Sequence, residues 1–478
     1  MNWFNRKKDG SAKGDGRMGS AAGMAGGTAG GGSFQQAEDP RGADAALSGS
    51  PSTDSRACYR QLTAALSGSS QGVILKLHIE NFKRMNELFG VGYCEDLLEA
   101  ILGFLQDQAK APVFRYVGVE FIAILQDHTQ GQASRLAEAL IDRFQESWTI
   151  SGRECTCSCQ IGLCSYPGFA SNADELLKYL DLAVGQAEAI GSNEYAVYDS
   201  QLHSQFLRRQ SIARGLGAAL DKDEVEVRFR PTYHTQERQF TRAELSMRIF
   251  IPDLGMVGSA EYVPVAEDTG QIRRLEYYTL NRAALLIARL LEEQTPFESI
   301  AVPVSAVVLL QEDFTDTVDQ LLEYYHIPSG KLAIEVDEAA LSTSFVPLTV
   351  VMQELSALGV ELILNNFGSG YSGLNRLLEL PADTLKFERM FIWQLEANPQ
   401  SEPIVEGMIQ IASRLGRRLI AEGVETERQQ AALKRFGCPY QQGFYYAPAV
   451  SEDALSAVLG KSLKAAQAVL DQEREKGR

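Results

Sequence analysis

The sequence has no apolar stretch long enough to cross a membrane. A membrane-spanning helix needs about 20 predominantly apolar residues. The longest candidate, Ile300 to Leu310, is far shorter and indicates a buried strand with its flank. The N-terminal pair Lys7 and Lys8 is not followed by the apolar run of a secretory signal. We therefore expect a cytoplasmic protein without a transmembrane segment.

The chain also lacks an excess of positive charge. It has 45 lysines and arginines against 62 aspartates and glutamates, and its formal net charge is −17. Proteins that bind along a nucleic-acid backbone need a basic surface, so we expect no nucleic-acid partner. A small basic pocket for a single nucleotide remains compatible with this charge.

Cysteine is scarce, with seven residues in the chain, but Cys155, Cys157 and Cys159 alternate. In a strand, such residues lie about 6.6 Å apart on one face. Three thiolates in this arrangement cannot easily converge on one ion at about 2.3 Å each. We therefore expect buried strand cysteines rather than a metal cluster.

Composition and periodicity divide the chain into five segments. Residues 1–56 are rich in glycine, alanine and serine and have too little apolar surface to offset the entropy of ordering, so we predict a disordered tail. Residues 57–199 mix strand and helix signals, which indicates an α+β domain. Residues 200–222 favour a basic helical connector. Repeated βα units over 223–460 indicate a TIM-type barrel. Residues 461–478 are predicted to form a helical tail.

The expected elements of the α+β domain follow from the periodicity of apolar residues. Helices are predicted over 82–108 with a break at Gly90, over 133–148 and over 174–190. Strands are predicted over 73–79, over 113–125 as two strands around Gly118, over 155–166 and over 195–198.

The predicted barrel strands end in polar side chains. In a TIM-type barrel the chemistry lies where the strands end. One polar strand end is usually a helix cap, but five in register around a barrel mouth favour a pocket. The residues concerned are Glu244, Glu335, Asn365 with Asn366, Lys386 with Glu388, and Glu422 with Glu425.

Three segments of the second half resemble the EAL-domain phosphodiesterases that hydrolyse cyclic di-GMP. They read NNFGSGYS over 365–372, LPADTLKFER over 380–389 and AEGVET over 421–426, where that family has DDFGTGYS, LPVDTLKIDR and AEGVET. Gln442 and Gly443 follow in the expected place. The resemblance covers roughly 205–460 and implies a barrel that takes cyclic di-GMP.

Residues 57–199 resemble the GGDEF domain of diguanylate cyclases. The corresponding segments are NFKRMN over 81–86, RYVGVEF over 115–121 and GSN over 191–193. Both resemblances together identify a tandem GGDEF–EAL protein, and both domains depart from their family patterns.

The departures in the EAL half fall on the metal site. The family holds a pair of divalent ions, about 3.5–4 Å apart, between carboxylates. The resemblance places two metal glutamates on Glu244 and Glu335, the metal asparagine on Pro303, and two aspartates on Asn365 and Asn366. Proline offers no side-chain oxygen, and an amide oxygen brings no charge. We therefore expect no Mg²⁺ site and no phosphodiesterase activity.

Other residues of the EAL pattern remain. The resemblance implies that Lys386 is the active-site lysine, Glu422 the proposed general base and Glu338 the residue that steadies the loop after 365. Ser246 replaces a leucine that packs on the ligand, which puts tight binding in doubt. The expected ligand-binding residues are Arg248, Glu244, Lys386, Glu422, Glu425, Gln442 and Arg230.

The cyclase half departs further. Val117 replaces the glycine that lets the backbone approach GTP, and Val119 cannot supply the metal carboxylate of its position. The other metal aspartate corresponds to His78. Glu188 and Ser192 replace the lysine and arginine that bind phosphate, so we expect no cyclase activity. The guanine-contacting positions that match are Asn86 and Glu95.

Three readings of the function follow. The first is a non-catalytic effector whose barrel binds cyclic di-GMP without cleaving it and acts on a protein partner, with an output such as motility or biofilm formation. The second is a protein–protein adaptor that has also lost the ligand, and the third is a weak phosphodiesterase. Barrels of this family commonly pair, so a homodimer through the barrel stays open.

Arg230 stands where the family has a glutamine before a proline. The alternation over 225–230 places Arg230 on the face opposite Val225, Val227 and Phe229. If that face is the barrel interior, Arg230 can act with Lys386 as an internal counter-ion. We therefore predict a guanidinium within hydrogen-bonding distance of Glu244, Glu335 or Glu422; the alternative is a surface arginine.

Overall fold

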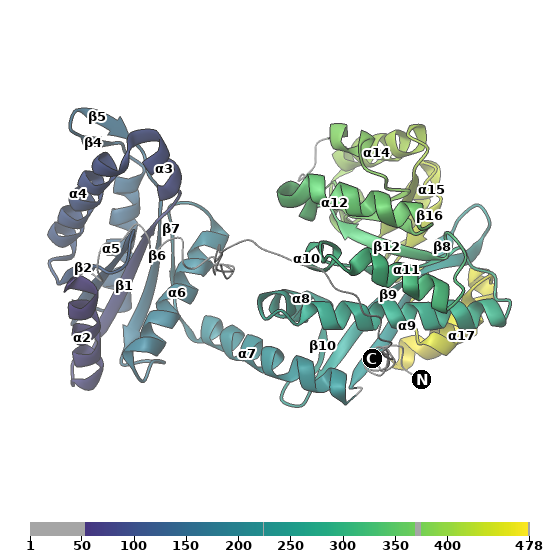
Figure 1. Cartoon of the computed structure of the whole chain (residues 1–478), viewed down its shortest axis with the longest axis horizontal. Coiled ribbons are helices and arrows are strands. Elements are labelled where there is room, and N and C mark those ends of the chain that lie inside the picture. Colours follow the sequence, from purple (N-terminus) through teal and green to yellow (C-terminus); the bar gives the residue numbers. More distant parts are fainter. Residues whose placement is uncertain (1–52, 223, 369–373, 477–478) are drawn as a thin grey trace, which may run out of the picture. The chain divides into compact units, whose positions relative to one another are not determined.

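A computed structural model of the chain describes residues 53–222, 224–368 and 374–476. These residues form two compact units that divide at Leu207 and Arg208 (Figure 1). The predicted disordered tail lies outside the described residues up to position 52, and Thr53 begins a helix. Among the described helices, none is both long enough and apolar enough to cross a membrane.

The first unit is an α+β fold on a five-stranded sheet of order β2-β3-β1-β6-β7. Neighbouring strands are antiparallel except β6 and β7, which are parallel. The strands are β1 Gly72–Ile79, β2 Val113–Arg115, β3 Glu120–Gln126, β6 Cys159–Tyr166 and β7 Glu194–Val197, with a separate hairpin of β4 Trp148–Ile150 and β5 Arg153–Cys155. The helices are α2 Thr53–Ser67, α3 Phe82–Phe89, α4 Val91–Ala109, α5 Gln130–Phe144 and α6 Ala173–Ile190.

The alternation of side chains along β1 divides the core of this unit between the two faces of the sheet. Val73 and Leu75 belong to the cluster that includes α4 and α5. Ile74, between them, belongs to the cluster that includes α2 and α6. The predicted α+β class is therefore confirmed, and the helix break at Gly90 lies between α3 and α4 as expected.

Two predicted elements of this unit were wrong at their ends. The helix expected to reach Trp148 ends at Phe144, because Trp148 begins β4 and packs its ring edge-on against Phe144, 5.5 Å between centroids. The strand expected over 155–166 is interrupted. Cys155 ends β5, which pairs with β4, and Cys159 begins β6, which pairs with β1, so the chain changes sheets between them.

The second unit begins within helix α7, Ser200–Asp221, which confirms the predicted helix. Its strands are β8 Val225–His234, β9 Gln239–Ile251, β10 Gly255–Gly258, β11 Ser299–Pro303, β12 Leu332–Asp337, β13 Glu361–Phe367, β14 Thr384–Phe387, β15 Arg418–Glu422 and β16 Tyr440–Gln442. Its helices are α8 Ser259–Asp268, α9 Ile272–Glu292, α10 Ala306–Leu309, α11 Phe314–Tyr324, α12 Ala340–Ala357, α13 Arg389–Ala397, α14 Glu402–Arg414, α15 Glu427–Arg435, α16 Glu452–Val458 and α17 Leu463–Lys476, with 3₁₀ turns η2 Leu374–Leu378 and η3 Pro399–Ser401.

These strands close into a barrel. The sheet runs in the order β9-β11-β12-β13-β14-β15-β16-β8, with β10 added outside β9, and β8 pairs back with β9. The barrel confirms the TIM-type expectation with one difference: β8 is antiparallel to both β9 and β16. The reason is local, because β8 and β9 are joined by a tight turn after His234 and form a hairpin.

The barrel interior is charged at the end where the parallel strands begin. Arg242 of β9 donates to Glu361 of β13 at 2.6 Å, and both side chains are 4% exposed. Arg418 approaches the same carboxylate at 3.0 Å. Burial alone would raise the pKa of Glu361, but the two arginines lower it overall. Above this layer, Ala301, Ala333 and Ile363 form a small apolar cluster.

Candidate functional site

The opposite end of the barrel collects the polar strand ends. Glu335 follows the apolar layer by two residues on β12, so strand alternation points it into the barrel. Glu244 of β9, Lys386 of β14 and Glu422 of β15 meet it there. We call these four side chains, together with Arg230, the mouth cluster.

Lys386 lies at the centre of the mouth cluster. Its Nζ is 2.7 Å from Glu244 Oε2, 3.3 Å from Glu335 Oε2 and 3.2 Å from Glu422 Oε2. The lysine side chain is 1% exposed. Removing a lone ammonium from water is costly, so this position is tolerable only because three carboxylates surround it.

Arg230 supplies the second positive charge, as the sequence predicted. Its Nη1 lies 3.2 Å from Glu244 Oε1 and 3.6 Å from Glu422 Oε1. Phe229, its neighbour on β8, points the other way and is fully buried in the core of the unit. The predicted contact between Arg230 and a mouth carboxylate is therefore confirmed, and the alternative of a surface arginine is wrong.

The charges of the mouth cluster do not balance without a proton. Three carboxylates face two cations, which leaves one negative charge. Burial, together with Glu244 and Glu422, raises the pKa of Glu335 to about 8 against the opposing effect of Lys386. Burial would also raise the pKa of Glu244, but Lys386 and Arg230 lower it overall. A proton held on Glu335 makes the cluster neutral.

The positions at which the sequence departs from the EAL pattern lie around this cluster. Pro303 ends β11 beside Glu335, with which it pairs in the sheet. The Oδ1 atom of Asn365 is buried and has no hydrogen-bond partner among the described residues. Asn366 adopts a left-handed backbone, φ 54°, and its Nδ2 donates to Asp337 at 2.5 Å. The loop that follows lies outside the described residues from 369 to 373.

Two further residues of the EAL pattern support the walls of the mouth. Glu338 is fully buried and accepts a hydrogen bond from the backbone N of Gly368 at 2.9 Å, so it fixes the start of the loop after Asn366. Gln442 of β16 donates to the carbonyl of Arg230 at 3.0 Å. Glu425 is not brought to the mouth cluster: it is exposed at the start of α15, where its backbone N donates to Gln429.

Ser246 and Arg248 continue the face of β9 that carries Glu244. The hydroxyl of Ser246 donates to the carbonyl of Arg228 on β8 at 3.4 Å. Arg248 is exposed and pairs across the ribbon with Glu226. The two side chains therefore form the outer part of the wall above the mouth cluster.

The first unit holds a second buried lysine that the sequence analysis missed. Lys76 of β1 is 4% exposed, and its Nζ lies 2.8 Å from Glu120 and 2.5 Å from Asp181. His78 Nδ1 is 3.9 Å from the same Glu120. A lysine in the middle of the apolar strand Gly72–Ile79 was the available signal.

The other predicted residues of this unit are spread over its surface. Glu95 is held by Arg115 through two hydrogen bonds of 2.6 and 3.1 Å, so its carboxylate already has a cation. Val117 is 58% exposed, and Glu188 is exposed on α6. Lys76 pairs instead with Glu120 and Asp181.

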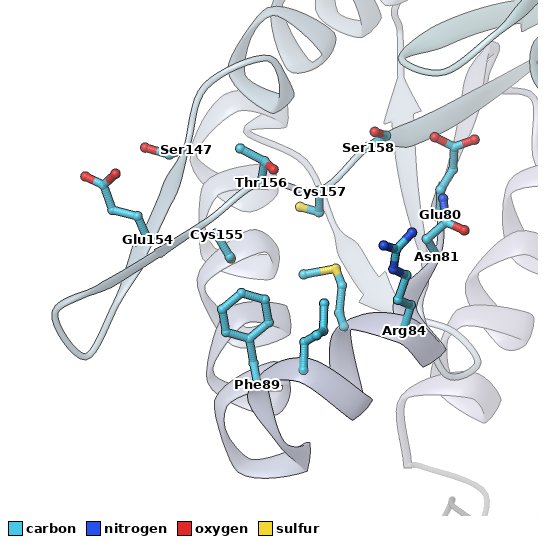
Figure 2. A pocket seen from close by; sticks show the side chains of 12 residues that line it. Glu80, Asn81, Arg84, Phe89, Ser147, Glu154, Cys155, Thr156, Cys157 and Ser158 are labelled. Atoms are coloured by element: carbon cyan, nitrogen blue, oxygen red, sulfur yellow. The ribbon is translucent and has the colours of Figure 1, made fainter.

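Cys155, Cys157 and Cys159 are buried free thiols, as predicted. Cys157 lies between two strands rather than in one. Burial raises its pKa to about 12. Cys155 and Cys157 line a hollow of about 610 Å³ between α3 and the segment 154–158 (Figure 2). The Cys157 thiol is therefore protonated at neutral pH and serves as a packing group beside this hollow.

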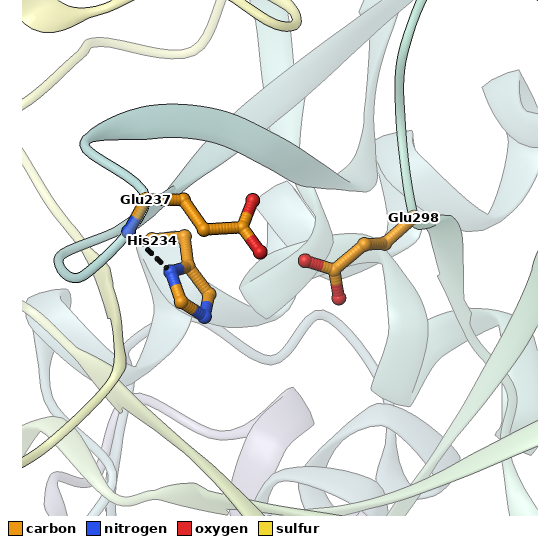
Figure 3. Close-up of side chains that lie close together, drawn as sticks. All are labelled: His234, Glu237 and Glu298. Atoms are coloured by element: carbon orange, nitrogen blue, oxygen red, sulfur yellow. Dashed lines mark hydrogen bonds between the residues drawn. The ribbon is translucent and has the colours of Figure 1, made fainter.

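At the other end of the barrel from the mouth cluster, His234, Glu237 and Glu298 lie close enough to hold a metal ion (Figure 3). The backbone N of Glu237 donates to His234 Nδ1 at 3.0 Å. The proton of a neutral ring is then on Nε2, so the ring has no free nitrogen lone pair. Glu298 is engaged by Arg242 at 2.7 Å. This group caps the barrel and is a poor metal site.

Comparison with known proteins assigns each half of the chain to a domain family. The family "Diguanylate cyclase, GGDEF domain" matches residues 56–194, and the family "EAL domain" matches residues 213–449. MucR of Pseudomonas aeruginosa, named a bifunctional diguanylate cyclase/cyclic di-GMP phosphodiesterase, is 28% identical over 388 residues, 80% of this chain and 57% of MucR. NbdA of the same organism, named a cyclic di-GMP phosphodiesterase, is 30% identical over 391 residues, 81% of this chain and 50% of NbdA. The chain thus spans about half the length of these curated relatives.

Among solved structures, the EAL enzyme Bd1971 in its cAMP- and cyclic-di-GMP-bound form is similar with a TM-score of 0.51. The sequences are 17% identical, and the match covers 71% of this chain and 81% of that one. This likeness supports the fold.

The first test of the mouth cluster is the substitution Arg230→Gln. Removing one partner from a buried ion pair costs about 3–5 kcal/mol, and from an exposed pair less than about 1 kcal/mol. Because Arg230 is 38% exposed, we expect a loss of about 1 kcal/mol in the free energy of unfolding of the barrel, measured by urea titration. Arg435→Gln, at an exposed pair with Glu402, should change it by less. Equal effects of the two substitutions would contradict the role of Arg230.

The second test concerns pH. Because the pKa of Glu335 is about 8 in the folded protein and about 4.5 otherwise, the folded state binds this proton more tightly. The stabilisation is complete below pH 4.5 and is lost as the pH rises through 8. Glu335→Gln should therefore make the fall in stability between pH 5 and 8 shallower. Part of the slope remains, because burial also raises the pKa of Glu276 to about 8. Identical slopes for wild type and Glu335→Gln would exclude a protonated Glu335.

Proposed function

The chain belongs to the tandem GGDEF–EAL proteins, and from this premise we propose that it is a non-catalytic effector in cyclic di-GMP signalling. Its EAL barrel binds cyclic di-GMP without hydrolysing it and passes the signal to a protein partner in the cytoplasm. The observation that carries the proposal is the set of side chains around the mouth cluster, where Pro303, Asn365 and Asn366 stand at positions that hold metal ligands in the family.

The donor set of the mouth supports the loss of hydrolysis. A pair of divalent ions needs several anionic oxygens to offset the repulsion between the ions. Pro303 offers none, and Asn365 and Asn366 offer only neutral amide oxygens. Glu244, Glu335 and Glu422 remain, but Lys386 and Arg230 already neutralise two of these charges. The residues present therefore do not fit a two-metal site.

The remains of the cyclase site support the loss of synthesis. Val119 stands where a carboxylate would bind metal, and Glu120 is paired with the buried Lys76 at 2.8 Å. Glu95, at a guanine-contacting position of the family, is paired with Arg115. The carboxylates that a nucleotide and its metal would need are therefore satisfied by lysine and arginine side chains of the chain itself.

The proposal that the barrel still binds cyclic di-GMP is supported by the wall above the mouth cluster. Arg248 is exposed on the same face of β9 as Glu244, where a guanidinium can donate two hydrogen bonds to one phosphate. The competing proposal is an adaptor that binds no nucleotide. Ser246 favours it, because a serine gives less apolar contact to a guanine base than the leucine of the family. A weak phosphodiesterase is the third reading, favoured only by the retained Lys386 and Glu422.

The proposal predicts that the purified protein neither makes nor cleaves cyclic di-GMP. GTP or cyclic di-GMP is incubated with Mg²⁺ or Mn²⁺, and the products are separated by liquid chromatography. We expect no product above a protein-free blank, because each lost metal ligand removes part of the charge that lowers the barrier. Linear pGpG released by the wild type and not by Glu422→Ala would overturn the proposal.

A companion prediction is that cyclic di-GMP binding needs no divalent ion and depends on Arg248. In isothermal titration calorimetry, the dissociation constant should be the same in Mg²⁺ and in EDTA. Arg248→Ala should raise it about 10- to 100-fold, the worth of one charge-assisted pair. Arg273→Ala, at a surface pair with Asp313, is the matched control. Binding that disappears in EDTA would contradict the metal-free site.

A further inference from the structure

Helix α17 carries a buried acid within an otherwise apolar packing face. Ala466, Leu470 and Glu473 are spaced by four and three residues and so lie on one face of the helix. They are 1%, 0% and 3% exposed. The helix follows the part of the chain that the EAL family matches, which ends at residue 449. Burying a carboxylate is costly unless it is paired, so Glu473 needs a cation.

The cation is Arg228 of β8. Its Nη1 donates to Glu473 Oε2 at 2.6 Å. The backbone N of Ser451 donates to the same oxygen at 3.1 Å. The guanidinium also reaches Glu226 through Nε at 2.6 Å. This ion pair joins α17 to the barrel at a position where an apolar side chain would have been enough for packing.

Arg228 is also part of the wall of the mouth. Strand alternation places it on the same face of β8 as Arg230, two residues along, and Arg230 contacts Glu244 and Glu422. In the register of the β8–β9 ribbon, Arg230 pairs with Glu244 and Arg228 pairs with Ser246. One guanidinium therefore lies between the wall of the mouth and the C-terminal helix.

We propose that Arg228 is a phosphate-binding residue of the mouth and that it exchanges the Glu473 carboxylate for a ligand phosphate, which releases α17. This inference rests on the proposed function, and it names the element that carries the signal. A guanidinium offers the same planar pair of donors to a carboxylate and to a phosphate. The two anions therefore compete for one site.

When a phosphate takes Arg228, Glu473 keeps the hydrogen bonds from Ser451 but loses this guanidinium. A buried carboxylate that loses a cation is less stable until its side chain reaches water. The ligand thus favours a state in which the end of α17 has moved away from the barrel, and this difference in affinity is what couples the two sites. A protein that recognises the freed face of α17 or the surface beneath it would then respond to cyclic di-GMP.

The test is hydrogen–deuterium exchange of the full chain, followed by mass spectrometry, with and without saturating cyclic di-GMP. We expect the amides of α17 to exchange faster with the ligand, by about tenfold or more, while peptides around Lys386 exchange more slowly. This comparison needs no substitution. If the mouth peptides are protected and those of α17 do not change, the exchange of anions is excluded and the proposed function stands.

Glu473→Gln gives the second measurement. It keeps the size of the side chain but removes the competing anion, so cyclic di-GMP should bind about tenfold more tightly, by calorimetry, than to the wild type. Asp471→Asn removes an exposed carboxylate of the same helix, which pairs with Arg474, and should leave the affinity unchanged. If Glu473→Gln binds cyclic di-GMP but the wild type and Asp471→Asn do not, Glu473 blocks the site completely in the wild type, and this result supports the competition. Equal affinities for all three proteins would overturn it. No binding by any of them would overturn the proposed function itself.

Discussion

The structure of the barrel depends on the burial of three carboxylates at one end. Glu244, Glu335 and Glu422 come from three strands, and a barrel that brings them together must neutralise them. Lys386 does most of this, since its ammonium is 1% exposed and touches all three. Arg230 supplies the second positive charge, and the raised pKa of Glu335 favours a proton on that carboxylate. Two carboxylates that a metal pair would need are absent around this cluster, because Asn365 and Asn366 stand at their positions, and the proposed loss of hydrolysis rests on this difference.

Carboxylates within the fold are also paired with cations of the chain at other places. At the far end of the barrel, Arg242 and Arg418 neutralise the buried Glu361. In the cyclase-like unit, Lys76 lies against Glu120, the acid retained from the family motif. In each case a carboxylate within the fold is paired with a cation of the chain itself. In the proposed effector, an anionic dinucleotide would compete with these carboxylates for the cations.

Local pattern in the sequence was enough to predict most of the elements, and the family resemblance was enough to predict most of the mouth cluster. The alternation over 225–230 placed Arg230 on the face opposite the apolar side chains of its strand, and the resemblance placed Glu244, Glu335 and Lys386 together. Pairs between distant residues could not be predicted in this way. Arg242 and Glu361 are 119 residues apart, and Glu473 is 245 residues from Arg228. The direction of β8 depends on strand pairing, and the end of α5 at Phe144 depends on ring packing. The local periodicity of the sequence predicts neither of these.

The central claim is that cations of the chain occupy the place of the metal pair at the mouth. The most direct measurement is an anomalous X-ray difference map of crystals soaked in Mn²⁺. We expect no manganese peak between Glu244, Glu335 and Glu422, with Lys386 Nζ in contact with all three. Two peaks about 3.5–4 Å apart in that position, with Lys386 displaced, would contradict the account.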